Sequence, residues 1–273
     1  MTTTAPQTVP LPSMARVYRI RIGVELKEFF RQREAVVFTL MFPVILLLVF
    51  GAVLNYDIGS GVNFTQYFMA GVIAAGILGS SLQNMAISIA TERSDGTLKG
   101  LAGTPMPKSA YFVGKVVQVL VVTVLIEAIL LVIGAVFYDV TLPSGTDWFT
   151  FAWVTALGSA ACTLLGIAAS GLAKNGRSAS AIITPIALVL QFISGVFFLF
   201  SQVPTWMQTV AAIFPLKWMA QGLRSVFLPE ALAAQEPAGS WELPRVALVL
   251  AVWCVAGLAL CVATFRWQDR SAG

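Results

Sequence analysis

Long apolar runs separated by short polar segments make up most of the 273-residue chain. Each run holds about 20 residues or more, which as an α-helix spans roughly 30 Å of hydrocarbon. The pattern predicts six transmembrane helices, over residues 35–54, 66–90, 113–137, 148–173, 179–200 and 244–265. The expected fold is therefore an all-α polytopic membrane protein, with residues 35–265 as its six-span transmembrane domain.

Residues 203–228, between the fifth and sixth apolar runs, are semi-polar and contain Pro204 and Pro215. Proline removes a backbone hydrogen bond and clashes with the preceding helical turn, so a straight membrane span is not expected here. We interpret this external segment as re-entrant or interfacial helices.

Residues 14–34 precede the first apolar run and carry an amphipathic pattern. The side chains near one apolar face are Tyr18, Ile22, Leu26, Phe29 and Phe30. Such a pattern is typical of an interfacial helix on the cytoplasmic leaflet. The alternative is a basic topology signal that happens to be helical. Residues 1–13 are expected to be flexible, and because they lack a basic region, no signal cleavage is expected.

Composition and charge agree with a membrane protein and suggest its orientation. Hydrophobic residues make up 58% of the chain and charged residues 11%, with a mean hydropathy of +0.83. Short basic segments tend to stay cytoplasmic. One side of the predicted membrane holds Arg16, Arg19, Arg21, Lys27, Arg31, Arg33, Arg93, Lys99, Lys108, Lys115, Lys174, Arg177, Arg266 and Arg270, and the other holds Lys217, Arg224 and Arg245. Both termini, including the tail 266–273, are therefore expected to be cytoplasmic.

Several function classes are disfavoured by missing residue types. The chain has no histidine, which removes HExxH metalloprotease and Ser-His chemistry, so no catalytic residue is expected. Its three cysteines lie inside predicted spans without a CxxC pair, so neither a disulfide framework nor a metal site is expected. No GxxxxGK[ST] or GxGxxG motif occurs. The net charge of +4 follows from the loop bias, so nucleic-acid binding is not expected.

The cytoplasmic loop 91–109, between the second and third spans, has a pattern of its own. Ser94 or Asp95 could cap a short helix through residues 96–101, which Thr104 and Pro105 would end. Leu98 and Leu101, three positions apart, would then form an apolar knob flanked by charges. Such a knob suits docking into a cleft of a soluble partner. The alternative is an ordinary solvated loop whose charges only set topology.

Two stretches resemble a known family. ERSDGTLKGLAGTP after the second span, and SGVFFLFSQVPTWMQTVAAIFPLKWMAQGLR before the last, look like those of ABC-2 type transporter permeases, most closely the daunorubicin-type drug exporters. The resemblance covers nearly the whole chain. One departure concerns Leu199-Phe200. Many relatives have a proline soon after the Phe pair, and this chain has Leu199-Phe200 there. The resemblance therefore does not fix the residue at which span five ends on the external side.

The resemblance implies a coupling helix that docks on a nucleotide-binding ATPase subunit. Its residues would be Glu92, Arg93, Asp95, Gly96, Thr97, Leu98, Lys99, Gly100 and Leu101. ATP and Mg²⁺ would be bound by that ATPase, and no cofactor by this chain. A second permease chain is implied as well, expected to form a homodimer in a complex of two permeases and two ATPases, with a heterodimer left open.

Glu127 lies near the middle of the third span, where an ionised carboxylate costs about 2.5–3.5 kcal/mol. It could line a translocation path for a cationic amphiphile, or take up a proton. Alternatively it holds helices together through hydrogen bonds. Other polar residues within predicted spans, also candidates for the path, are Gln83, Asn84 and Gln191.

The function expected from these observations is that of the permease subunit of an ATP-driven exporter, which moves a hydrophobic or amphiphilic drug, antibiotic or lipid by alternating access. The alternative is a proton- or ion-coupled secondary transporter that uses Glu127. Against it, the neighbouring predicted spans offer no charged partner for this carboxylate, and no repeated halves with paired broken helices are evident.

Overall fold

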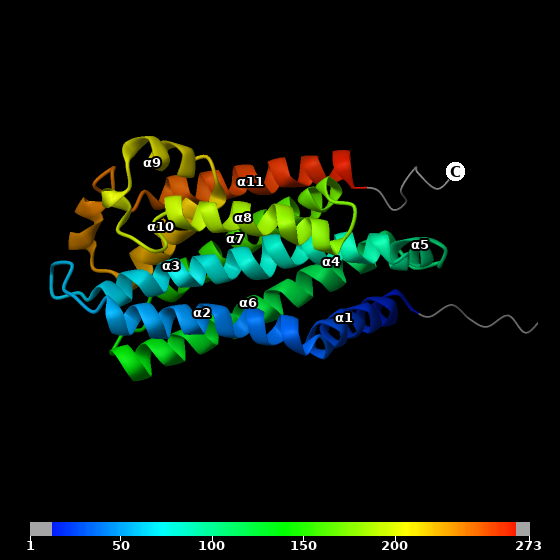
Figure 1. The fold of residues 1–273 in the computed structure, drawn as a ribbon, viewed down its shortest axis with the longest axis horizontal. Coiled ribbons are helices and arrows are strands. Elements are labelled where there is room, and N and C mark those ends of the chain that lie inside the picture. Colours follow the sequence, from blue (N-terminus) through cyan, green and yellow to red (C-terminus); the bar gives the residue numbers. More distant parts are fainter. Residues whose placement is uncertain (1–12, 266–273) are drawn as a thin grey trace, which may run out of the picture.

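The computed structural model describes residues 13–265 as an elongated bundle of helices (Figure 1). Within that part of the chain, six helices are long and apolar enough to cross a membrane, which confirms the predicted count. The spans are α2 (Arg33–Val53), α3 to α4 (Phe64–Ser94), α6 (Lys108–Tyr138), α7 (Asp147–Ala169), α8 (Gly176–Ile193) and α11 (Leu243–Thr264). Residues 1–12 and the predicted tail 266–273 lie outside the described residues.

The second span forms the centre of the bundle. Sixty-seven per cent of its apolar window is buried, against 22% for α2 and for α11, which lie at the periphery. It consists of α3 (Phe64–Leu78), a π-helical turn η1 (Gly79–Gln83) and α4 (Asn84–Ser94). Such turns widen a helix locally and often mark functional positions. The central span therefore carries an irregular turn halfway along its length.

The fifth span ends earlier than predicted. We expected it to reach residue 200, but α8 ends at Ile193 and the chain turns at Gly195, whose φ is +72°. A Cβ atom on Gly71 would lie 2.7 Å from the carbonyl oxygen of Val196, so the returning backbone packs directly on α3. The Tyr67 hydroxyl accepts a hydrogen bond of 2.9 Å from the Phe200 amide. These contacts turn an apolar stretch into a loop inside the bundle.

The segment between spans five and six is helical, as predicted. It forms α9 (Thr205–Ala211) and α10 (Pro215–Phe227), followed by the 3-10 helix η4 (Glu230–Gln235). Helix α10 is almost entirely buried and packs against α3, α7 and α11. The buried Arg224 guanidinium pairs with Glu236 at 2.6 Å. Helix α10 therefore lies within the bundle and not on its surface.

Lys217 on α10 gives a prediction about pH. Burial lowers the pKa of Lys217 to about 8 from its ordinary 10.5. Its ammonium lies 3.6 Å from the centre of the Trp218 ring and donates to Gln221. Because the folded chain then binds fewer protons than the unfolded chain between these two values, stability rises with pH in that window, by roughly 1–3 kcal/mol from pH 8 to 10. Melting curves in detergent should show this rise.

The matched variant for this prediction is Lys217→Met, because it removes the titrating group and leaves every other lysine and tyrosine in place. We expect the gain between pH 8 and 10 to be smaller in Lys217→Met than in the parent by that amount. Equal slopes in the two proteins would contradict the assignment.

Helix α1 (Met14–Arg31) precedes α2 and packs against α6. Its buried face consists of Arg21, Glu25 and Phe29, one helical turn apart. Phe30, on the predicted apolar face, is 43% exposed, as suits a side chain of an interfacial helix that meets lipid. The buried face carries two charges, which the apolar pattern does not predict. Those charges are tolerated because they have ionic partners, described below.

The two ends of the bundle differ in what they carry (Figure 1). The short helix α5 (Thr97–Ala102) and α1 lie at the end where α11 finishes, and α9 and α10 lie at the opposite end. This arrangement groups the segments that we assigned to one side of the membrane. That this side is cytoplasmic stays a prediction.

Candidate functional site

The loop between the second and third spans contains the predicted short helix, with shifted bounds. Helix α5 runs over Thr97–Ala102, and the Asp95 carboxylate accepts a 3.0 Å hydrogen bond from the Thr97 amide. Thr104 donates to the Leu101 carbonyl at 2.7 Å at the other end. Glu92 and Arg93, which we had grouped with the coupling helix, belong instead to the last turn of α4.

The predicted apolar knob does not face solvent, and this part of the interpretation was wrong. Leu98 is only 1% exposed and packs in a cluster with Met85, Ile89 and Tyr111. Leu101 is partly buried against the same cluster. The two leucines therefore fasten α5 to its own chain. The exposed residues of this loop include Ser94, Asp95, Thr97, Lys99 and Gly100, with Gly96 half-buried, so the surface offered to a partner is polar.

Arg93 joins α4 to the end of the fourth span. Its guanidinium donates to the carbonyl oxygens of Ser170 at 2.5 Å and Ala173 at 2.7 Å. A cation at the carboxyl end of a helix is favoured by the unpaired carbonyls there. Arg93 therefore positions α4 against α7.

A buried ionic network connects α1, α4 and α6 at the base of this loop. The Lys115 ammonium, on α6, bridges Glu92 on α4 and Glu25 on α1, the latter at 2.9 Å. Arg21 pairs with Glu25 one turn away, and the Tyr111 hydroxyl donates to Glu92 at 2.9 Å. Lys115 and Glu25 are each 1% exposed. These contacts tie the helix leading into α5 to two further helices.

Charge balance keeps this network stable. Burial raises the pKa of Glu25, and the Lys115 ammonium acts in the opposite direction. An ionised carboxylate in such surroundings is retained only when a cation compensates its lost hydration. No sequence pattern predicts the whole network, because its members are distant in the chain. The only local signal was Arg21 and Glu25 at i, i+4.

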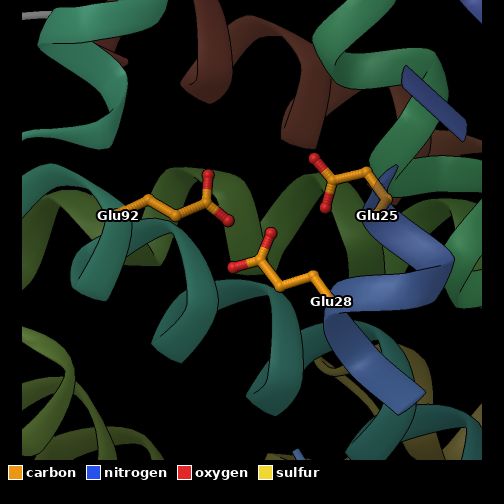
Figure 2. Close-up of side chains that lie close together, drawn as sticks. All are labelled: Glu25, Glu28 and Glu92. Carbon is orange, nitrogen blue, oxygen red and sulfur yellow. The ribbon is translucent and has the colours of Figure 1, made fainter. Parts of the chain in front are cut away.

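Three carboxylates converge at this network, those of its members Glu25 and Glu92 and that of Glu28, as Figure 2 shows. Oxygens of Glu25, Glu28 and Glu92 all lie within 4.8 Å of one another, a spacing that could hold a cation. The Lys115 ammonium already bridges two of the three. We therefore assign no metal to this cluster, and the expectation that the chain binds none stays a prediction.

A cavity of about 350 Å³ lies between α1, α2, the central span, α6 and α8. Glu25, Glu92 and Lys115 of the network form part of its wall. Three of the predicted path residues line it, namely Gln83, Asn84 and Gln191. The π-helical turn contributes Gly79 and Ser80 to its wall. A pocket of this size accommodates a drug-sized molecule. The irregular turn of the central span thus faces the space where a cargo could lie.

Glu127 is not part of the cavity wall. Its carboxylate, 5% exposed, accepts a 2.7 Å hydrogen bond from Thr155 of α7. The residues that line the cavity do not include it. Of the two roles considered for Glu127, this geometry corresponds to the one in which it joins helices, and its placement on a translocation path is not supported.

Comparison with known proteins agrees with this architecture. The family described as ABC-2 type transporter matches residues 18–228. The inner membrane transport permease YadH of Escherichia coli is 26% identical over 261 residues, which cover 91% of this chain and 95% of YadH. The transport permease YvfS of Bacillus subtilis is 23% identical over 191 residues, which cover 70% of this chain and 77% of YvfS. The family match covers most of the chain, and we conclude that this multi-pass membrane protein belongs to the ABC-2 type transporter family.

Proposed function

We propose that the chain is the permease subunit of an ATP-driven exporter whose ATPase is a separate subunit. The observation that carries this proposal is the position of α5, a short helix with a polar exposed face, fastened from inside to the central span. The chain has no phosphate-binding loop, so ATP and Mg²⁺ would be bound by the partner. Family membership supports the same assignment.

The buried contacts offer a path for mechanical coupling. A displacement of α5 would be transmitted through Leu98 to α4 and α6, and through Glu92 and Lys115 to α1. Helix α4 continues into the π-helical turn at the cavity wall. Packed interiors respond to a push by switching between discrete arrangements and not by gradual deformation. Alternating access of the cavity would follow from such a switch.

A second permease chain completes the proposed complex of two permeases and two ATPases. Next to the cavity, α2 and α8 present large apolar side chains to the outside, including Phe38 at 68% and Val189 at 58% exposure. In a membrane these side chains meet either lipid or another chain. A neighbouring copy placed there would close the open side of the cavity. With both termini cytoplasmic, each ATPase would dock on α5.

The proposal is tested by purifying the tagged chain from its native membrane in mild detergent. We expect an ATPase subunit to copurify in stoichiometric amount, and ATP hydrolysis to occur once the complex is placed in lipid. Lys99→Glu, which reverses a charge on the exposed face of α5, should release the ATPase while the chain itself remains folded. Purification of a chain that hydrolyses no ATP and carries no ATPase would refute the proposal.

The permease proposal and the secondary-transporter alternative predict different results for Glu127→Gln. Under the permease proposal, we expect transport within about twofold of the parent and an unchanged melting temperature, because Gln keeps the oxygen that accepts from Thr155 and the side chain lies off the cavity. Uptake into vesicles with and without a proton gradient measures this. Loss of proton-coupled transport in Glu127→Gln would favour the alternative. Thr155→Val, which removes the donor, is the matched control for the helix contact.

A further inference from the structure

The cavity is acidic at one end. Four carboxylates line it, those of Glu25, Glu28, Glu92 and Asp95, and Lys115 is the one cation among the described lining residues. Arg21, behind the wall, pairs with Glu25. Four carboxylates against two cations leave a formal charge of minus two. Charges of one sign in a low-dielectric cleft raise the local concentration of ions of the opposite sign.

The excess negative charge belongs to two side chains. Glu25 and Glu92 are neutralised by Lys115 and Arg21. Glu28 makes no ion pair and no hydrogen bond within the described residues, and the Asp95 carboxylate is occupied only by the Thr97 amide. Arg177, one turn before the lining residue Ser180 on α8, does not line the cavity. A cation that enters at this end would therefore meet uncompensated carboxylates.

A second observation points to a ligand deeper in the same cavity. Gln191 lines it, is 6% exposed, and its carbonyl oxygen Oε1 has no hydrogen-bond partner within the described residues. A buried acceptor left unpaired loses its hydration without compensation, so such groups are normally satisfied. An N–H or O–H donor on a bound molecule would satisfy it.

The remaining wall has an apolar part and a part with uncharged polar side chains, among them Gln83, Asn84 and Gln118. The apolar part includes Phe38, Phe42, Pro43 and Leu46 of α2 and Val72 and Ala75 of the central span, with Phe38 at the open side of the cavity. This surface would remove the hydrocarbon or aromatic part of a bound molecule from water, which favours binding. The cavity thus combines an acidic end, an apolar part and, on Gln191, a buried acceptor without a partner.

We infer that this cavity binds an amphiphile with a cationic head group. The head group, an ammonium or a similar cation, lies at Glu28 and Asp95, the apolar body lies on the α2 wall, and a donor on that body meets Gln191. This inference rests on the proposed function and specifies its cargo. An anionic amphiphile of the same size is disfavoured, because its charge would lie next to carboxylates.

The test uses two fluorescent amphiphiles of similar shape, the cationic rhodamine 6G and an anionic sulforhodamine. Binding to the full chain, together with any subunit that copurifies, is measured in lipid nanodiscs by fluorescence polarisation. We expect rhodamine 6G to bind at least about tenfold more tightly than the anionic dye, as suits a site of opposite charge. Glu28→Gln should raise the Kd for rhodamine 6G about five- to tenfold, and Glu28→Lys should reduce the preference for the cation further.

The control is Glu34→Gln, which removes an exposed carboxylate that does not line the cavity and should change the Kd less than about twofold. Gln191→Leu should weaken binding of rhodamine 6G while keeping the charge preference, since it removes only the buried acceptor. Equal binding of the two dyes, or equal effects of Glu28→Gln and Glu34→Gln, would overturn the inference. These readouts do not depend on the ATPase. Loss of copurification would refute the proposed function alone.

Discussion

Replacing Lys115 by methionine is expected to destabilise the chain by about 3–5 kcal/mol, because it leaves Glu25 and Glu92 buried beside each other without their shared cation. Removing one member of a buried ion pair costs more than the pair contributes, since the remaining charge keeps its desolvation penalty. Thermal unfolding in detergent, followed by circular dichroism, should show a melting temperature several degrees lower. Transport coupled to ATP hydrolysis should fall in parallel.

The control for this effect removes the stranded charge as well. A double variant, Lys115→Met with Glu92→Gln, should recover most of the lost stability, because Glu25 keeps Arg21 as its ionic partner and no ionised group of the network is then left unpaired. Lys27→Met removes an exposed lysine of α1 and should change stability by less than about 0.5 kcal/mol. If Lys115→Met melts like Lys27→Met, the network does not hold α1, α4 and α6 together.

Leu98→Asp is expected to detach α5 from the bundle and to abolish partner binding for that reason. The substitution places a carboxylate where a 1% exposed leucine packs on Met85 and Tyr111, at a cost of about 3–5 kcal/mol. Each 1.4 kcal/mol is a factor of ten, so the amide protons of Thr97–Ala102 should exchange with deuterium about 100-fold faster or more. Hydrogen–deuterium exchange read by mass spectrometry measures this directly.

The Lys99→Glu variant distinguishes loss of partner binding from unfolding of α5. Lys99 is exposed on the same helix, so its replacement should leave the exchange rates of α5 within about twofold of the parent while the ATPase subunit is lost. A Leu98→Asp chain that keeps normal exchange protection yet loses its partner would mean that Leu98 contacts the partner directly. That outcome would restore the apolar-knob interpretation that the burial of Leu98 argues against.

The number and approximate bounds of the spans could be read from the sequence because each depends on local composition alone. A run of about 20 apolar residues satisfies its own backbone hydrogen bonds as a helix, whatever its neighbours are. The short helix in the loop 91–109 was likewise predictable, since Asp95 and Thr104 act within a few residues of their own positions. Gln83, Asn84 and Gln191, which line the cavity, could be singled out because polar groups are rare inside spans.

What lies opposite each side chain was decided only by tertiary packing. Glu25, Glu92 and Lys115 belong to three helices, and no local pattern indicates that they meet. The spacing of Leu98 and Leu101 likewise suits a buried face and an exposed face equally. The hydrogen-bond partner of Glu127, Thr155, lies 28 residues away in the sequence. The early end of α8 depends on the room that Gly71 leaves for the backbone at Val196. Local sequence determines which segments become helices, whereas the faces they turn to one another follow from close packing and from the need to pair every buried charge.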